Sequence, residues 1–263
     1  MDKGVLYIVG DDKYFEETVQ SAKSIRRYTS VDIAVVTERD PEDCPEIFDQ
    51  IIFSDTLGVD FSDKVRNIDK SPFDRTVFLD ADTYVTEDIS PLFNILDTVD
   101  IAASHAPYRS DAEVNVPEPF PEFNTGVVPF ADRESVHELF DSWIDYYSTF
   151  NYEKDQPAFR KAMYETSVRH HVLTPEWNCR SIYPGYLDGN VKIIHGRHDD
   201  LEEVEQKLNS RDQMRVHYRT KRGLKIRGNS AEWLHKRLLE SIKERGISQT
   251  AVQGMQYLRG KNY

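Results

Sequence analysis

Long apolar runs are missing from this sequence of 263 residues. No stretch approaches the roughly 18 to 20 apolar residues that a helix needs to cross a bilayer. The first residues, Met1–Tyr7, have neither the apolar core nor the cleavage site of a secretory signal. Cysteine is also scarce, since Cys44 and Cys179 lie far apart and fit no metal-ligand spacing. We therefore expect two free thiols in a protein of the reducing cytoplasm.

Basic side chains are scarce over most of the chain and abundant only near its end. Residues 1–210 carry 42 acidic and 20 basic side chains, whereas residues 211–263 carry 4 acidic and 13 basic ones. An acidic body disfavours nucleic acid as a partner, because phosphate binding needs a basic surface. We predict one domain over residues 1–210 and a basic extension over 211–263. The extension suits either an anionic membrane surface, at the cytoplasmic side, or packing against the acidic body.

Internal repeats, low-complexity tracts and Pro/Ser-rich linkers are also absent, and the elements that are present alternate between strand and helix. The apolar run Val5–Val9 is typical of a strand buried on both faces, and Gly10–Asp12 is a turn and helix-cap signal. Helical spacing through residues 15–25 leads to a second strand at 32–36. Strand, helix and strand in this order predict a parallel sheet.

The remaining elements follow from the same patterns. Further strands are predicted at residues 50–53, 76–79, 100–104, 126–130 and 191–194, and helices at 132–149 and 155–166. Residues 231–242 have apolar side chains at helical spacing among basic ones, which predicts an amphipathic basic helix. The fold class is therefore α/β: a Rossmann-like, mixed and mainly parallel sheet flanked by helices, with a basic helical appendage.

Two acids follow one of the predicted strands directly. Thr76–Leu79 runs into Asp80 and Asp82, and ligands in open α/β sheets bind beyond the carboxyl ends of strands. Two carboxylates one residue apart can bind one Mg²⁺ or Mn²⁺, ions that in turn bind diphosphates. His195 follows the predicted strand 191–194 and would emerge at the same sheet edge as a third ligand. The alternatives are a solvated acid pair and a hydrogen-bonded histidine at a strand end.

Five short segments in a fixed order resemble the GT-A-fold glycosyltransferases of the family 8 type, the group of glycogenin and the bacterial lipooligosaccharide galactosyltransferases. The matching segments are Val9–Tyr14, Phe78–Thr83, Phe123–Val127, Asp155–Gln156 and His195–Gly196, and they cover roughly residues 4–200. The resemblance implies a GT-A fold, a nucleotide-sugar donor (with UDP favoured) and transfer with retention of anomeric configuration.

The resemblance also implies roles for individual residues. It assigns Asp80, Asp82 and His195 to the metal, with Mn²⁺ or Mg²⁺ as the cofactor, and Asp155, Gln156 and Asp82 to catalysis. The residues that it assigns to the donor are Val9, Gly10, Asp11, Tyr14, Lys64 (or its neighbour Arg66), Asp80, Ala81, Asn124, Thr125, Gly126, Gly196 and Arg197. Within this set, Asn124–Gly126 and the Asp155–Gln156 pair would hold the donor sugar.

Some of these segments have local interpretations as well. Asp11 and Asp12 could cap the first helix, and Asp155 could be the N-cap of a helix with Pro157 in its first turn. Asn124–Gly126 could be an ordinary turn before a strand.

The sequence departs from the family at two places. It has Gly196–Asp199 where the relatives run on to a Lys-Pro-Trp segment that helps bind the diphosphate, and Arg197 could supply that charge instead. Lys13 stands where the family often has asparagine, which leaves the base preference open.

These observations predict a metal-dependent glycosyltransferase (of the hexosyltransferase type) that acts on a glycan, a lipid-linked or a protein acceptor. Two alternatives belong to other classes: a haloacid-dehalogenase-type phosphatase with Asp80 as its nucleophile, and a non-catalytic module that binds sugar nucleotides or glycans. Neither the sugar, the base nor the acceptor can be deduced from the residues. Residues 104–121, rich in proline, are either a loop on the acceptor side or an ordinary irregular surface loop.

Overall fold

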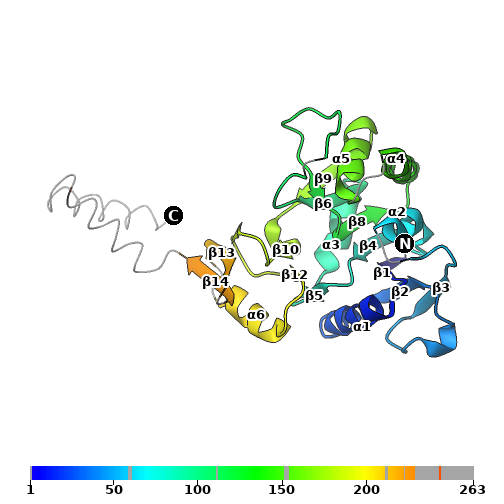
Figure 1. The fold of residues 1–263 in the computed structure, drawn as a ribbon. Coiled ribbons are helices and arrows are strands. Elements are labelled where there is room, and N and C mark those ends of the chain that lie inside the picture. The colour runs from blue at the N-terminus through cyan, green and yellow to red at the C-terminus, as the bar shows by residue number, and fades with distance from the viewer. Residues whose placement is uncertain are drawn as a thin grey trace.

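A computed structural model describes residues 2–58, 61–110, 112–150, 154–210, 213–221 and 223–228, together with Lys243. Its largest element is a mixed sheet (Figure 1). The strands, in spatial order, are β3 (Gln50–Phe53), β2 (Asp32–Thr37), β1 (Lys3–Ile8), β4 (Arg75–Leu79), β8 (Val127–Ala131), β6 (Ile101–His105) and β7 (Phe123–Asn124), while β9 (His170–Leu173) also pairs with β6. The first four are parallel to one another, and β8 turns antiparallel to β4.

Helices cover both faces of this sheet, because successive side chains of its strands point to opposite sides. Leu6 contributes to the core beneath α2 (Ser62–Asn67), α4 (Glu134–Phe150) and α5 (Gln156–Glu165). Val5 and Tyr7 contribute to the opposite core, beneath α1 (Asp12–Arg26) and α3 (Ser90–Asn94). Single 3₁₀ turns lie at η1 (Pro41–Asp43), η2 (Ile68–Lys70), η3 (Ile95–Asp97) and η4 (Pro175–Trp177).

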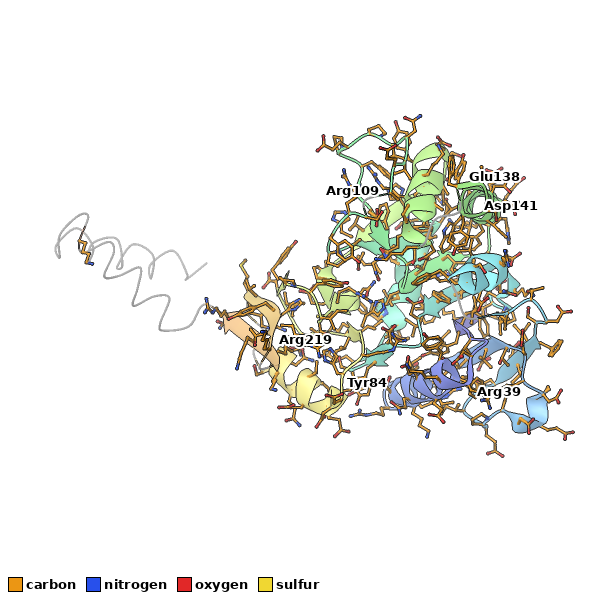
Figure 2. All side chains as sticks on the ribbon, viewed as in Figure 1. Arg39, Tyr84, Arg109, Glu138, Asp141 and Arg219 are labelled. Atoms are coloured by element: carbon orange, nitrogen blue, oxygen red, sulfur yellow. The ribbon has the colours of Figure 1, made fainter. Side chains whose placement is uncertain are left out.

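Two small sheets and one further helix of the described residues adjoin this body. One sheet joins β10 (Cys179–Arg180), β12 (Ile193–His195) and β5 (Thr83–Val85); the other joins β11 (Gly185–Leu187), β13 (Arg215–Thr220) and β14 (Gly223–Gly228). Their apolar side chains and those of α6 (Leu201–Leu208) share a third core with Tyr84. The Tyr84 hydroxyl accepts a hydrogen bond from Arg27, at the C-terminal end of α1, and so ties this unit to the main body. Figure 2 shows Tyr84 where this unit adjoins α1.

The predicted fold class is confirmed, and the structure adds the position of the chain's last described strands. Hairpin β13–β14 belongs to the predicted extension, yet β13 pairs with β11 of the body. A domain boundary at residue 210 and a membrane-binding role of residues 211–263 remain predictions, and the amphipathic helix predicted at 231–242 lies outside the described residues. None of the helices in the described ranges has the length and apolar composition that crossing a membrane requires.

A buried carboxylate ties three segments of the main sheet together. Asp100, 3% exposed, accepts hydrogen bonds from the Arg133 guanidinium, from the backbone and side chain of Arg169, and from the Ser135 hydroxyl. Burial alone would raise the pKa of Asp100, but the hydrogen bonds from Arg169, Arg133 and Ser135 hold it below its ordinary value.

Replacing Asp100 with asparagine is therefore expected to lower the free energy of unfolding at pH 7 by about 2–3 kcal/mol. Because the folded-state pKa is depressed, the stabilisation is present above the unfolded pKa of about 4 and is lost as pH falls through the folded value. Urea unfolding at pH 7 and pH 3 should show the difference between the two proteins shrinking in acid. The control is Asp97→Asn. The Asp97 side chain is 61% exposed and pairs with Arg75 at the surface, so its substitution should change the stability little.

Candidate functional site

The turn that follows β4 places two carboxylates beside the start of β8. The antiparallel pairing sets Leu79 opposite Val127, and the Asp80 amide donates to the Gly126 carbonyl at 2.9 Å. The Thr83 hydroxyl donates to the Asp80 carbonyl at 2.8 Å and closes the turn. Asp80 and Asp82 therefore face the Asn124–Gly126 segment, which is far from them in sequence.

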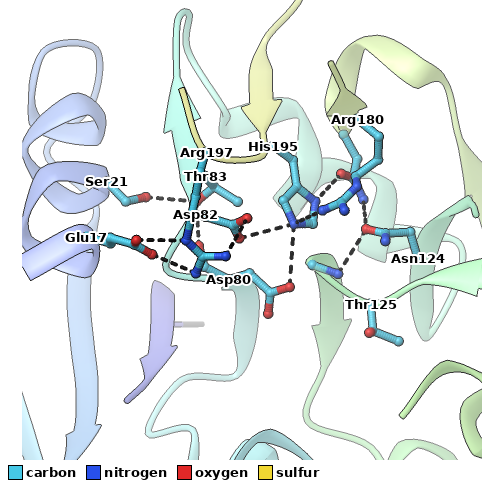
Figure 3. A network of polar contacts seen from close by, with 12 residues as sticks. Glu17, Ser21, Asp80, Asp82, Thr83, Asn124, Thr125, Arg180, His195 and Arg197 are labelled. Atoms are coloured by element: carbon cyan, nitrogen blue, oxygen red, sulfur yellow. Dashed lines mark hydrogen bonds and ion pairs between the residues drawn. The ribbon is translucent and has the colours of Figure 1, made fainter. Parts of the chain in front are cut away.

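His195 completes a cluster with these acids (Figure 3). Its Nε2 lies 3.6 Å from an Asp80 oxygen and 3.3 Å from an Asp82 oxygen, and the three potential ligand atoms lie within 4.8 Å of one another. The sequence prediction was wrong on one point: it placed His195 at the edge of the main sheet, but β12 does not join that sheet. It pairs instead with β5, which sets His195 opposite Thr83. Strand β5, which follows the Asp80–Asp82 turn, thus brings His195 next to the two carboxylates.

A buried amide orients this histidine and selects the tautomer of its neutral form. The Asn178 Nδ2 group donates to Asn124 Oδ1 at 2.8 Å, so Asn178 Oδ1 is the acceptor that faces His195 Nδ1, also at 2.8 Å. The hydrogen of a neutral His195 therefore lies on Nδ1, which leaves the Nε2 lone pair directed at the carboxylates. Arg180 donates to this same lone pair at 2.5 Å, and Nε2 can serve either the guanidinium or a metal ion, not both at once.

The carboxylate of Asp82 is held in its charged form. Burial by itself would raise the pKa of Asp82, but the positive charge of the protonated form of His195, with smaller contributions from Arg197 and Arg180, lowers it below the ordinary value. A bound metal ion would take the place of that proton on Nε2. A charged carboxylate and an imidazole lone pair are what a divalent cation requires.

A buried lysine lies beneath the cluster. Lys64 Nζ is 3.2 Å from both Asp80 Oδ1 and Asp155 Oδ2, and it donates to Thr125 Oγ1 at 3.0 Å. The Thr125 hydroxyl in turn donates to Asp155 at 2.6 Å. Burial would lower the pKa of Lys64, but Asp155 and then Asp80 raise it above its ordinary value, so the ammonium group remains charged.

The structure excludes the capping interpretation of the Asp155 side chain. The residue stands at the N-cap position of α5, but its side chain makes no capping hydrogen bond. It is 2% exposed and faces Lys64 and Thr125 instead. Asp11 has both roles. Its carboxylate caps α1 by accepting a hydrogen bond from the Lys13 amide at 2.8 Å, and Asp11 also lines the cavity described next.

A cavity of about 350 Å³ opens above the cluster. The predicted site residues that line it are Val9, Gly10, Asp11, Tyr14, Lys64, Asp80, Ala81, Asp82, His195 and Arg197. Asn124, Thr125, Gly126 and Asp155 lie in the hydrogen-bonded network next to it, and Gln156 follows as the first residue of α5. The alternative donor residue Arg66 is exposed and lies outside the lining, so the structure favours Lys64 of the two.

The segment that departs from the family supplies one charge to this cavity. Arg197 forms a two-pronged ion pair with Glu17, with both N–O distances at 2.8 Å, and its guanidinium lies 5.1 Å from the centre of the Tyr14 ring. Gly196 does not line the cavity but holds the segment in place: its amide donates to the Asp82 carbonyl at 2.9 Å, at a φ of +129° that favours glycine.

Among the residues that sequence reasoning missed, Asn178 and Arg180 are the two that hydrogen-bond to His195. Both come from a segment without a motif or a clear periodicity, and the parallel pairing of β10 with β12 brings them to His195. No local pattern could have found them, because that pairing joins strands distant in sequence.

The residues present fit a divalent cation. Two carboxylates and an imidazole nitrogen are ligands that Mn²⁺ accepts, and Asn178 supplies the outer hydrogen bond that commonly orients a ligating histidine. Asp80, Asp82 and His195 would be the ligands.

No protein-family model and no curated protein matches the sequence. Solved structures do resemble it. The chain superimposes on mouse xyloside xylosyltransferase 1 with a TM-score of 0.51 and 16% identity, over 75% of this chain and 98% of that one. The galactosyltransferase LgtC, in complex with donor and acceptor sugar analogs, gives 0.52 and 15%, over 68% of this chain and 75% of that one.

A third structure is larger than this chain. The glycosyltransferase GlyE of Streptococcus pneumoniae TIGR4 gives a TM-score of 0.54 and 18% identity, over 76% of this chain but only 56% of GlyE. At identities this low, the likenesses show a shared fold, which is the GT-A arrangement expected from the sequence.

Proposed function

We propose that this protein is a metal-dependent glycosyltransferase that takes a sugar from a nucleoside-diphosphate donor, with retention at the anomeric carbon. The observation that carries the proposal is the cluster of Asp80, Asp82 and His195 at the mouth of a cavity, in a fold shared with glycosyltransferases. A cation bound there would neutralise the charge that develops on the leaving diphosphate.

The cavity has two further cations for an anionic donor. Lys64 is charged and buried beside Asp80, and Arg197 lies over Tyr14 with its guanidinium 3.9 Å from an Asp82 oxygen. Such groups stabilise charge that accumulates on phosphate oxygens as the anomeric bond breaks, since they are already in place when it breaks. The Val9–Asp11 turn and Tyr14 line the same cavity and would contact the nucleoside.

The sugar would lie toward Asn124–Gly126 and Asp155. Asp155 is ion-paired with Lys64 and hydrogen-bonded to Thr125, so we assign it a positioning role toward the sugar. Gln156 carries a neutral amide, a poor nucleophile, and we assign it a positioning role as well. Retention then follows if the electron pair of the anomeric C–O bond leaves with the diphosphate and a phosphate oxygen accepts the acceptor's proton on the same face.

The test is a donor-hydrolysis screen of UDP-, GDP- and dTDP-sugars with and without Mn²⁺. Release of the nucleoside diphosphate that depends on Mn²⁺, with one base preferred, is the expected result. Phosphate release from a simple phosphomonoester, with a covalent phosphate on Asp80, would favour the phosphatase alternative instead. A protein that binds UDP but hydrolyses no donor would favour the non-catalytic one.

Gly126 offers a further prediction, because a side chain there would collide with the cluster. A β-carbon on Gly126 would lie 1.9 Å from His195 Cε1 and 2.7 Å from an Asp80 oxygen. Gly126→Ala is therefore expected to weaken Mn²⁺ binding at least about tenfold, the cost typical of disturbing a ligand's support. Isothermal titration calorimetry checks this, with Gly189→Ala as the control. That glycine has a φ of +127° and open space around it, so its substitution should cost stability and leave Mn²⁺ affinity unchanged.

A further inference from the structure

A second cavity, of about 410 Å³, lies on the other side of Arg180 from the donor cavity. Its walls come from the end of β6 at Ser104, the residues 172–175 at the end of β9, Asn178–Arg180, the β11 region at 184–186, and His217 of β13. Arg180 lines both cavities, and Asn178 joins them through its hydrogen bonds to Asn124 and His195.

Unsatisfied polar atoms concentrate around this cavity. Among the residues that the structure describes, three buried side-chain atoms lack a hydrogen-bond partner: Ser104 Oγ, Arg180 Nε and His217 Nδ1. All three belong to residues that line the second cavity. Buried polar atoms are nearly always paired, because leaving one unpaired is costly. Because all three belong to the lining of the same cavity, they indicate a ligand there whose polar groups hydrogen-bond to them.

The buried pair in the wall is not a nucleophile. Cys179 Sγ lies 3.9 Å from His217 Nε2, but burial raises the pKa of the Cys179 thiol to about 12. Burial, and then the charge of Arg215, lowers the pKa of His217 to about 4. At neutral pH the thiol is protonated and the imidazole is uncharged. His217 is therefore suited to hydrogen bonding with a neutral group.

The rest of the lining fits a ring with one polar edge and apolar faces. Among the residues that the structure describes, no Asp or Glu lines the cavity, and Arg180 is the single Lys or Arg that does. Pro107, Pro175, Pro184 and Tyr186 contribute much of the apolar wall, and Tyr186 is 64% exposed. A sugar presents hydroxyls in its plane and C–H groups on its faces, which matches such a mixed wall.

The position of the cavity is also suitable for the second substrate. Ser104 pairs with Asn124 across β6 and β7, so the cavity begins one strand away from the segment that would hold the donor sugar. We propose that this cavity is the acceptor site and that it binds a pyranoside through Ser104, Arg180 and His217, with Tyr186 against its apolar face. The inference rests on the proposed function, since it assumes that a donor sugar lies beyond Asn178.

The test uses a panel of p-nitrophenyl glycosides of glucose, galactose, xylose, mannose and N-acetylglucosamine. Saturation-transfer NMR measures their binding to the full chain in the presence of UDP and Mg²⁺, a diamagnetic ion that leaves the ligand resonances sharp. His217→Phe keeps the ring but removes its nitrogens, and Tyr186→Ala removes an exposed ring without disturbing a core. The controls are His137→Phe and Tyr164→Ala, at exposed sites on α4 and α5.

We expect the wild type to bind at least one glycoside, and both cavity variants to weaken that binding tenfold or more while the controls do not. UDP affinity, measured in parallel, shows that each variant is folded. The proposal is overturned if no glycoside binds the wild type, or if both cavity variants bind like it. The readout needs no turnover, so failure of donor hydrolysis alone would speak against the proposed function and not against a sugar site in this cavity.

Discussion

Replacing Asp82 with asparagine is expected to abolish metal-dependent turnover while leaving the fold intact. The substitution removes one of two carboxylates from the cluster, and with it the charge that faces His195 at 3.3 Å. The structural contact of this residue survives, because the Gly196 amide bonds to the backbone carbonyl of Asp82 and not to its side chain. We expect kcat/KM for donor hydrolysis to fall at least about 10³-fold, which corresponds to ~4 kcal/mol.

Three measurements separate the possible causes. Calorimetric titration with Mn²⁺ should show weaker binding, circular dichroism should show an unchanged fold, and steady-state hydrolysis should show the loss. Asp145→Asn, at an exposed position of α4, makes the same chemical change away from the cluster and should behave as wild type. Full activity of the Asp82→Asn protein would remove Asp82 from the metal site and end the metal assignment.

The second large effect concerns stability. Lys64→Met leaves Asp155, which is 2% exposed, without the cation that it faces at 3.2 Å. Breaking a buried ion pair by removing one partner typically costs about 3–5 kcal/mol, because the remaining charge stays desolvated. We expect the free energy of unfolding at pH 7 to fall by about 3 kcal/mol, since Thr125 still donates to the Asp155 carboxylate.

A second substitution tests the cause of that loss. In the Lys64→Met/Asp155→Asn protein no buried charge is left alone, so much of the stability should return in urea unfolding. Equal destabilisation of the single and double variants would show that lost packing of the lysine stem, not charge, accounts for the effect.

The sequence predicted the order of the elements well, because hydrophobic periodicity is a local property. The strands at 32–36, 50–53 and 76–79 lie in β2, β3 and β4, and the helix predicted at 132–149 overlaps α4, which begins two residues later at Glu134. The predicted and observed ends of an element differ by a residue or two where an apolar residue next to the element is not part of it. Thus 191–194 became β12, Ile193–His195.

Local patterns were less informative about what each side chain contacts. Asp155 reads as a helix cap from its neighbours, yet its carboxylate pairs with Lys64 from α2. His195 was expected at the edge of the main sheet, yet it lies in a separate sheet beside β5. Both side chains are buried, so each needs a polar partner, and a residue of another element supplies it: Lys64 for Asp155 and Asn178 for His195.

By itself, the sequence determined that apolar strands alternate with helices in the first half of the chain, and that two acids follow one of those strands. Those properties depend on residues near one another in the chain, so they can be deduced before any contact is known. Only the tertiary structure decided that Asn178 orients His195, that Arg180 stands between two cavities, and that three unsatisfied polar atoms surround one of them. These properties depend on strand pairings between distant segments, which form because together they bury apolar surface that no segment can bury alone.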